Sequence, residues 1–391
     1  MKHYLLEPLA PLVCRSGRPF GTQADADDIN FPLPSAAAGL MRSQHLEAQG
    51  WILDAETENS TRGRLRDDQH HALQQLASKG PFLAQEDRDG NITVLVPKPA
   101  DVLYLQERTT NKTNIHRLRP APWPHDADGC DLPPGLLPVQ LQNTVKGKPQ
   151  PGPAYWPLEH SLRWQRGESL NFADLPAHTL PIETRTHVQI DRERDAAAEG
   201  RLYQTAAYDL QAARKNHHQG WEECAYRLLI QSEVDSNSPL VRLGGEGRLS
   251  RCRQIPPDPA FIPAADLADT INAARGLRLT LLTPAIFQHG WRPGWLDDTL
   301  HGTLPHTDIR VRLRACAIER WQPVSGWDMH HHRPKAMRKA VAAGAVYWLE
   351  TLTPADHIAA LAFSAISDDP QAQRDGFGIV SIAAWHTPNY S

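Results

Sequence analysis

The chain has 391 residues, of which 40% are hydrophobic and 22% are charged, and its formal net charge is −4 at pH 7. This length favours two domains or one large domain, and no apolar run is long enough to cross a membrane. The acidic balance is not typical of a protein that binds nucleic acid over its whole surface. The 41 basic residues are mostly arginine, however, and arginine binds phosphate through two parallel hydrogen bonds. The composition therefore permits local RNA binding, although a GC-rich coding sequence would also enrich arginine.

The five cysteines are scattered along the chain and form no CxxC pair. This spacing argues against a zinc ribbon and against a disulfide framework. The N-terminal segment predicts a strand rather than a signal peptide. We therefore expect a cytoplasmic protein that does not bind a membrane.

The first half predicts strands, short helices and one long connection. Residues 3–14 are apolar enough for a buried strand, and a helix is expected to begin near Pro34, because proline is favoured in a first helical turn. A second amphipathic piece lies around residues 70–80. The segment FLAQEDRDGNITVLVPKP at residues 82–99 predicts a hairpin, since RDGN supplies a turn between strand-forming runs. Frequent prolines make residues 118–180 a long irregular connection and a candidate domain boundary.

The second half contains more strands than the first. Strands are expected at residues 186–192, 201–210, 223–233, 277–287, 308–321, 345–352 and 376–386. Residues 354–366 predict an amphipathic helix. Strands and helices that alternate with hairpins in both halves predict an α+β fold rather than a parallel doubly wound sheet. Since neither a GxGxxG nor a P-loop motif occurs, we expect no nucleotide cofactor.

An arginine- and glycine-rich loop, CRSGRPFG, precedes the first helix. Arg15 and Arg18 on this loop can reach phosphates. The helix start near Ser35 presents free N–H groups and the positive end of the helix dipole, which together form an anion site. Arg42 lies about two turns into that helix. The alternative is a solvated arginine loop beside an ordinary helix start.

A second glycine-rich loop, GGEGRLSRCR, places Gly244 and Gly245 ahead of Arg248. Glycines remove side-chain obstruction while arginine supplies charge, so the loop either contacts RNA or forms a hairpin turn with exposed arginines. We expect Glu246 to pair with a neighbouring arginine rather than to bind RNA.

A third loop, RDGFGIV, flanks Phe377 with Gly376 and Gly378. A phenylalanine on such a loop could stack on a base, a contact worth about 1–3 kcal/mol. The alternative is a glycine turn with the ring in the core.

The remaining motifs are weaker. The strand near residue 187 carries Arg185 and His187, and His187 could move protons only with a partner group, so we favour a structural or RNA-contacting role. The densest basic run ends at Lys339. Three interpretations stay open for it: a contact with phosphate, a contact with an acidic protein face, or a solvated loop. Adjacent histidines at residues 330–332 cannot all face one metal ion, and the acidic segment at residues 25–30 predicts a solvated loop. No metal site is expected.

Several segments occur together in one order: RSGRPFG, FPLPSAAAGLMRS, RTHVQIDRERDAAAEGRLYQTAAYDL, GGEGR, KAVAAGAVYWLE and RDGFGIVSIAAW. The combination resembles the RAMP superfamily of CRISPR proteins, and within it the subunit-3 family of the type III-B Cmr effector complex. The resemblance extends over the whole chain through short motifs. It implies two ferredoxin-like (RRM-like, βαββαβ) domains with long irregular insertions, at residues 1–180 and 181–391, the second with the glycine-rich loop.

The resemblance also implies a function in antiviral defence. Such a subunit is not an enzyme; it binds the guide RNA, holds the crRNA 5′ tag, and bridges the large polymerase-like subunit to the backbone RAMP subunits in a hetero-oligomer without a cofactor. The residues expected to bind RNA are Arg15, Arg18, Ser35, Arg42, Arg185, His187, Gly244, Gly245, Arg248, Lys339, Gly376, Phe377 and Gly378. One alternative is a metal-independent endoribonuclease that processes CRISPR precursor RNA and uses His187 or His116. Another is a pure protein scaffold.

Overall fold

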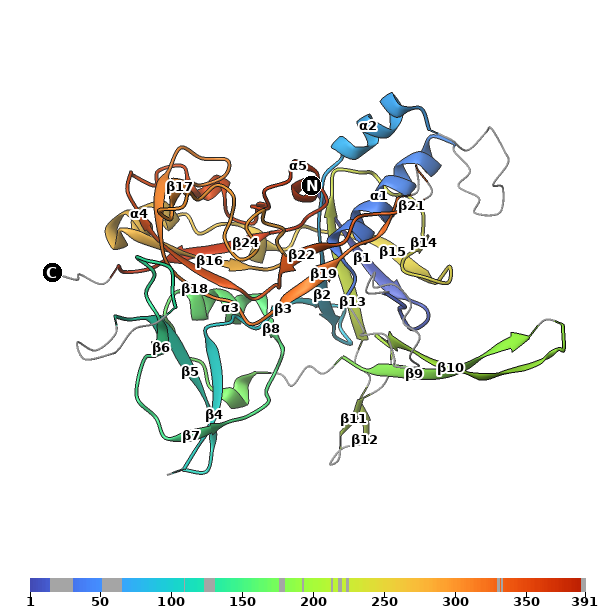
Figure 1. Ribbon diagram of the computed structural model, residues 1–391, viewed down its shortest axis with the longest axis horizontal. Helices are drawn as coiled ribbons and strands as arrows, with labels where there is room; N and C mark the ends of the chain where they lie inside the picture. Colours follow the sequence, from blue (N-terminus) through green and yellow to red (C-terminus); the bar gives the residue numbers. More distant parts are fainter. Residues whose placement is uncertain are drawn as a thin grey trace. The chain divides into compact units, whose positions relative to one another are not determined.

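The computed structural model describes residues 1–14, 31–50, 65–108, 110–122, 131–175, 180–191, 193–211, 214–216, 220–222, 225–328, 331 and 333–387. Over these residues the protein is mixed α+β, with many strands and few helices (Figure 1). The predicted α+β class is therefore confirmed. None of the helices in this part of the chain is both long and apolar enough to span a membrane.

The chain forms two compact units, and each unit draws on three separate segments. Unit 1 comprises residues 1–93, 180–256 and 323–338, and unit 2 comprises residues 94–179, 257–322 and 339–391. One boundary falls between residues 179 and 180, close to the predicted division of the chain. The assignment of two ferredoxin-like domains to residues 1–180 and 181–391 stays a prediction.

The main sheet of unit 1 is antiparallel, with the strand order β14-β15-β1-β13-β2. Its strands are β1 (Lys2–Pro8), β2 (Ser78–Glu86), β13 (Ala225–Ser232), β14 (Leu240–Arg242) and β15 (Leu249–Ile255). Tyr4, Leu6 and Leu228 are fully buried. The removal of such apolar side chains from water holds the sheet to its covering helix.

Helix α1 (Pro34–Ala48) packs on β2, β13 and β14. It begins at Pro34, as predicted, because the missing N–H of proline costs nothing in a first turn. Ala37 and Met41 lie one turn apart and are fully buried, so they form the face of α1 that meets the sheet. Helix α2 (Asp67–Gln75) precedes β2.

The predicted turn between residues 82 and 99 is confirmed. After β2, the Asp87 carboxylate accepts hydrogen bonds from the N–H groups of Asp89 and Asn91 at 2.9 and 2.8 Å, and the chain continues into β3 (Ile92–Pro97). It passes from unit 1 to unit 2 within this strand.

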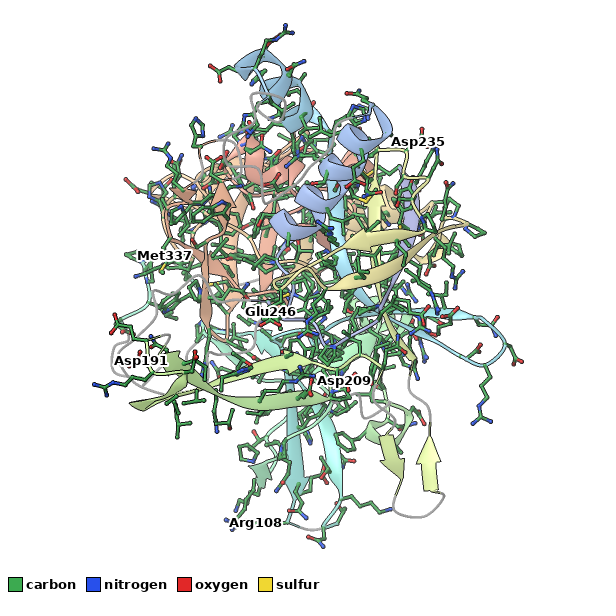
Figure 2. The ribbon with its side chains drawn as sticks, turned by 90° about the vertical axis from the view of Figure 1, so that its right-hand side faces the viewer. Arg108, Asp191, Asp209, Asp235, Glu246 and Met337 are labelled. Carbon is green, nitrogen blue, oxygen red and sulfur yellow. The ribbon has the colours of Figure 1, made fainter. Side chains whose placement is uncertain are left out.

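A long two-stranded hairpin in unit 1 joins β9 (Ile182–Asp191) to β10 (Ala196–Tyr208). It extends away from the main sheet of its unit (Figure 1), and Asp191 marks its far end in Figure 2. More than half of the surface of the Ile182, Ile190 and Leu202 side chains is exposed. The shorter strands of this unit are β11 (Arg214–Asn216), β12 (Gly220–Glu222), β20 (Trp327–Asp328) and β21 (Arg333–Pro334).

The larger sheet of unit 2 has the order β17-β18-β23-β16-β24. Its strands are β16 (Gly276–Leu281), β17 (His301–Thr303), β18 (Arg310–Ala317), β23 (Val346–Thr351) and β24 (Val380–Ala384). Helix α4 (Leu267–Ala274) contacts β16 and β24, and Ile271, Leu279 and Leu349 share one buried cluster. Strands β19 (Trp321–Val324) and β22 (Arg338–Val341) lie where the chain leaves and re-enters this unit.

The proline-rich segment at residues 118–180 is more regular than the sequence predicted. It supplies the short strands β6 and β7 to a four-stranded sheet, of order β6-β5-β4-β7, whose other two strands begin before residue 118, and it contains a helix. The elements are β4 (Val102–Glu107), β5 (Thr113–Pro120), β6 (Val139–Leu141), β7 (Gly147–Pro149), β8 (Tyr155–Pro157), α3 (Leu158–Gln165) and the 3₁₀ turn η1 (Phe172–Asp174). Pro120 and Pro149 end their strands and Pro157 caps α3. Prolines at such terminal positions do not remove an internal hydrogen bond, so they are compatible with regular structure.

The predicted helix at residues 354–366 is wrong. This segment contains only the 3₁₀ turn η3 (Ile358–Ala360), and the short helix α5 (Pro370–Arg374) follows it; a further 3₁₀ turn, η2 (Pro259–Phe261), precedes α4. The N–H groups of Phe363 and Ile366 donate to the carbonyls of Val380 and Gly378. Tertiary pairing therefore replaces the helical hydrogen bonds that the apolar spacing suggested.

Candidate nucleic-acid interface

A small hollow lies at the base of the β9–β10 hairpin in unit 1. Its volume is about 20 Å³, which is room for about one water molecule. A nucleobase does not fit, whereas an oxygen atom of a phosphate group does. The residues that line it are Pro11, Val13, Glu183, Arg185, His187, Thr205, Ala207, Glu246 and Arg248.

The hairpin supplies one wall of this hollow through strand alternation. Glu183, Arg185 and His187 lie two residues apart on β9 and so share one face. Arg185 is opposite Thr205 across the ladder, and Nε2 of His187 is 2.8 Å from Oγ1 of Thr205.

Two backbone contacts bring the N-terminal segment to the same place. Leu12 and Tyr208 exchange N–H···O=C hydrogen bonds of 2.8 and 3.1 Å, which fixes the chain just before Val13 against the end of β10. The N–H of Gly245 donates to the carbonyl of Val13 at 2.8 Å. Figure 2 shows Glu246, the next residue, beside the hairpin.

Gly244 permits that close approach. Gly244 has a φ of +85°, and a Cβ atom there would lie 2.9 Å from the Val13 carbonyl oxygen. A side chain would therefore meet both a backbone penalty and a steric conflict. Gly244 therefore serves the packing of the loop on the N-terminal segment. An approach of Gly244 and Gly245 to phosphate stays a prediction.

Carboxylates balance the arginines of the hollow. Nε of Arg185 lies 2.8 Å from Glu183 and Nη2 of Arg248 lies 2.7 Å from Glu246. The expected pairing of Glu246 with a neighbouring arginine is confirmed. The hydrogen bond from Arg185 to Glu183 raises the pKa of Arg185. Nε of Arg248 and Oε2 of Glu183 are buried, and neither has a hydrogen-bond partner among the described residues.

Ser35 and Arg42 do not line the hollow. Ser35 occupies the first turn of α1, where no side chain caps the N–H groups. Nη2 of Arg42 donates to the carbonyls of Leu76 and Gln74 at 3.0 and 3.4 Å, so Arg42 satisfies carbonyls at the C-terminal end of α2. RNA binding by Ser35 and Arg42 stays a prediction, and Arg15 and Arg18 lie outside the described residues.

The glycine loop in unit 2 is part of the core. Phe377 is only 1% exposed. Oγ1 of Thr283 donates to the Gly376 carbonyl at 2.7 Å, and the N–H of Gly378 donates to Pro284 at 2.7 Å. A buried ring does not stack on a base, so we withdraw that role for Phe377. The positive φ values of Gly376 and Gly378, +92° and +84°, account for both glycines as turn residues.

Two other candidates have local partners within unit 2. Nζ of Lys339 lies 5.2 Å from the centre of the Trp321 ring, and more than half of that ring's surface is exposed. His116 pairs with Glu107 at 3.3 Å on half-buried strands. No cluster of three or more potential metal-ligating side chains occurs in the described part of the chain.

The family comparison gives a clear result. The CRISPR-associated protein family Cas_Cmr3 matches residues 4–385. The chain belongs to the Cmr3 family. The resemblance expected from the sequence motifs is therefore confirmed, and no curated protein matches this chain.

Solved structures similar to this Cmr3-family chain include three from type III CRISPR complexes. One is a chain of the type III-B Cmr-beta complex bound to cognate target RNA, with 14% identity, a TM-score of 0.48, and coverage of 97% of this chain and 96% of that chain. Another comes from the same kind of complex with target RNA and AMPPnP, at 14% identity, a TM-score of 0.45, and coverage of 89% and 86%. The third comes from the Csm3–Csm4 subcomplex of a type III-A complex, at 8% identity, a TM-score of 0.36, and coverage of 90% and 94%.

Sequence reasoning missed several residues of the hollow in this Cmr3-family chain. Glu183 shares a strand face with Arg185, so the alternation of β9 could have found it. Val13 and Thr205 carry no such signal, because their places depend on pairing between distant segments.

Proposed function

We propose that the chain is a non-catalytic, guide-RNA-binding subunit of a type III-B CRISPR complex and that it holds the 5′ tag of the crRNA. Membership of the Cmr3 family supports the assembly. The observation that carries the site is the hollow of unit 1, where Arg185 and His187 of β9 line one surface with Arg248, which comes from a distant segment. Each of the three is also an RNA-binding candidate by sequence alone.

The hollow suits a phosphate contact. Arg185 and Arg248 each direct a hydrogen bond to a carboxylate, and a guanidinium group carries five donors. Donors therefore remain for a phosphate oxygen, and one of them is the buried Nε of Arg248. Arg185 is half exposed, so its side chain can turn from Glu183 toward an RNA strand.

The charge balance of the hollow limits its affinity. Glu183 and Glu246 offset the two arginines, so the hollow alone attracts a phosphate weakly. We assign further positive charge to Arg15 and Arg18, which follow Cys14 in the sequence. RNA binding by the isolated chain is then weak and falls as salt rises, because each neutralised phosphate releases counterions.

We assign His187 to positioning rather than to catalysis. Its Nε2 lies 2.8 Å from Oγ1 of Thr205 across the hairpin, and this contact holds the ring at the wall of the hollow. The subunit then sets the register of the guide RNA, while base pairing by the guide supplies sequence specificity.

Protein partners complete this proposal: the large polymerase-like subunit and a backbone RAMP subunit of the same complex. We assign two kinds of surface to these protein partners: the exposed apolar side chains of the β9–β10 hairpin, and the exposed rings of Trp321 and Trp327. Aromatic and aliphatic groups in this exposed setting are typical of protein interfaces.

The test measures binding and cleavage of a labelled guide RNA by the purified full chain. Fluorescence anisotropy with and without the 5′ tag, at two salt concentrations, compares the wild type with Arg185→Gln and Arg248→Gln. Arg88→Gln is the matched control, because Arg88 is exposed in the β2–β3 turn of the same unit and lies outside the hollow. Gel analysis in EDTA and in Mg²⁺ follows cleavage.

We expect tag-dependent binding that weakens about tenfold for either hollow variant, the equivalent of roughly 1.5 kcal/mol for one charge-assisted hydrogen bond. Arg88→Gln should bind as the wild type does. Equal affinity for tagged and untagged RNA would refute tag recognition. Site-specific cleavage in EDTA would replace the non-catalytic assignment with the endoribonuclease alternative.

A further inference from the structure

Unit 2 contains a second concave site, distinct from the hollow of unit 1. Its volume is about 500 Å³, which is within the range of small-molecule sites. The residues that matter for its chemistry are Arg117, Arg119, Arg166, Arg278, Trp348 and Trp385, which all line it. Four arginines with two indole rings form an unusual lining for a cavity of this size.

The buried wall of the cavity holds an arginine with one unmet donor. The side chain of Arg278 is only 4% exposed and forms a two-pronged pair with Asp101, with N–O distances of 2.8 and 3.1 Å. Its Nε is buried and has no hydrogen-bond partner among the described residues. A buried donor of this kind is costly to leave unsatisfied, and a ligand acceptor would satisfy it.

The same wall offers an unmet acceptor. Gln165, at the end of α3, is 3% exposed, and its Nε2 donates to Oγ of Ser381 at 2.8 Å. Its Oε1 is buried without a hydrogen-bond partner among the described residues. A fully ionised anion only accepts hydrogen bonds, whereas the edge of a nucleobase both donates and accepts. The combination of Arg278 and Gln165 therefore favours a base edge.

The other arginines give the cavity an excess of positive charge. Arg117 stacks on Trp164 at 3.5 Å and donates to the carbonyls of Trp164 and Glu168, so it is held in place. Arg166 pairs with Glu168 at 3.2 Å. Arg119 is exposed on β5, and no carboxylate among the described residues pairs with it. Of the lining residues only Asp101 is acidic.

We propose that this cavity binds a nucleotide. Arg119 and Arg166 hold the phosphate at the open side, the half-buried ring of Trp385 stacks on the base, and Arg278 with Gln165 recognises the base edge. Arginine and stacked aromatic rings are the groups that bind nucleotides without a glycine-rich phosphate loop. The site takes either a free mononucleotide or one nucleotide of an RNA strand, and its residues are independent of those in the hollow of unit 1.

The test is isothermal titration calorimetry on the full chain with four probes: 5′-AMP, adenosine, inorganic phosphate and a hexa-adenylate RNA. The variants are Arg119→Gln and Trp385→Leu. Arg119 is a surface residue, so its replacement leaves the fold intact, and circular dichroism checks this for both. Arg310→Gln is the matched control, because Arg310 is an exposed arginine of β18 that does not line the cavity.

We expect 5′-AMP to bind more tightly than adenosine or phosphate, and Arg119→Gln to weaken it about tenfold. Trp385→Leu should weaken AMP and adenosine but not phosphate, and Arg310→Gln should change nothing. If hexa-adenylate binds at least tenfold more tightly than AMP, and Arg119→Gln weakens both, the natural ligand is one nucleotide of an RNA strand. If AMP and hexa-adenylate bind with comparable affinity, the natural ligand is a free nucleotide.

The proposal would be overturned if neither AMP nor hexa-adenylate bound at millimolar concentration, or if neither variant changed their binding. Phosphate that binds as tightly as AMP would also overturn it, because the rings would then have no role. Arg88→Gln, which lies outside both sites, should also leave AMP binding unchanged. Because neither Arg119 nor Trp385 lines the hollow of unit 1, failure of the nucleotide site and failure of tag binding are separate outcomes.

Discussion

Alanine substitutions at three glycines of one loop test why the loop contacts the N-terminal segment. Gly244 has a φ of +85°, and an added Cβ would lie 2.9 Å from the carbonyl oxygen of Val13. Gly247 has a φ of +64° but open space around its Cβ position. The Cβ of Gly245 would sit 3.5 Å from the same Val13 oxygen, an ordinary contact, without a positive φ.

These geometries predict three different losses of stability. Gly247→Ala carries only the left-handed backbone penalty of about 1–2 kcal/mol. Gly244→Ala adds overpacking, about 1–3 kcal/mol more, so its total loss is roughly 2–5 kcal/mol. Gly245→Ala should change stability by less than about 0.5 kcal/mol. The order of the losses is therefore Gly244, then Gly247, then Gly245.

Urea denaturation followed by circular dichroism gives the three losses as shifts in midpoint against the wild type. Because Val13 leads into the arginine loop, the anisotropy assay for RNA also applies: Gly244→Ala should weaken binding while Gly247→Ala does not. Equal losses for Gly244→Ala and Gly247→Ala would refute the packing explanation. A large loss for Gly245→Ala would show that the close approach lies elsewhere in the loop.

Two further predictions concern buried groups. Asp101→Asn leaves the guanidinium of Arg278 buried without its counter-charge, so we expect the free energy of unfolding in urea to fall by about 3–5 kcal/mol. Asp298→Asn is the control: its carboxylate is 96% exposed, so the free energy of unfolding should fall by less than about 1 kcal/mol. Similar losses for the two variants would contradict the burial argument. Burial raises the pKa of the Cys14 and Cys316 thiols from 9.0 to about 11. At pH 8 the folded protein therefore holds about a hundredfold less thiolate at each cysteine than the unfolded protein does. Both thiols should react with N-ethylmaleimide correspondingly more slowly in the native protein than in urea. Labelling of the two thiols by mass spectrometry checks this, and equal rates in the native and unfolded protein would exclude it.

The sequence predicted elements whose signals are local. The helix start at Pro34 and the turn at Asp87 follow from residues that act on their own backbone. The helix expected at residues 354–366 did not form because the N–H groups of Phe363 and Ile366 pair with carbonyls at the start of β24 and just before it. Apolar spacing cannot reveal that competitor, which lies farther along the chain.

The candidate site likewise combines residues that the sequence singles out with contacts between distant segments that it does not reveal. Arg185 and Arg248 stand out in the sequence because charge and glycine surround them, but only the Leu12–Tyr208 bridge and the loop contact at Val13 bring them together. The cavity of unit 2 gave no sequence signal. Arg278 and Trp348 read as ordinary residues of strands, and their joint exposure to one cavity depends on the register between β16 and β23.

The place of β1 in its sheet constrains how this protein can be made. β1 is synthesised before both of its neighbours, β13 and β15, which begin at Ala225 and Leu249. Residues 9–224 are therefore made between β1 and the first of these neighbours, and a fragment that ends at residue 180 lacks both. Such long-range closure is slow and exposes a strand edge to aggregation. We therefore expect a fragment that ends at residue 180 to aggregate, whereas the longer chain can close the sheet around β1.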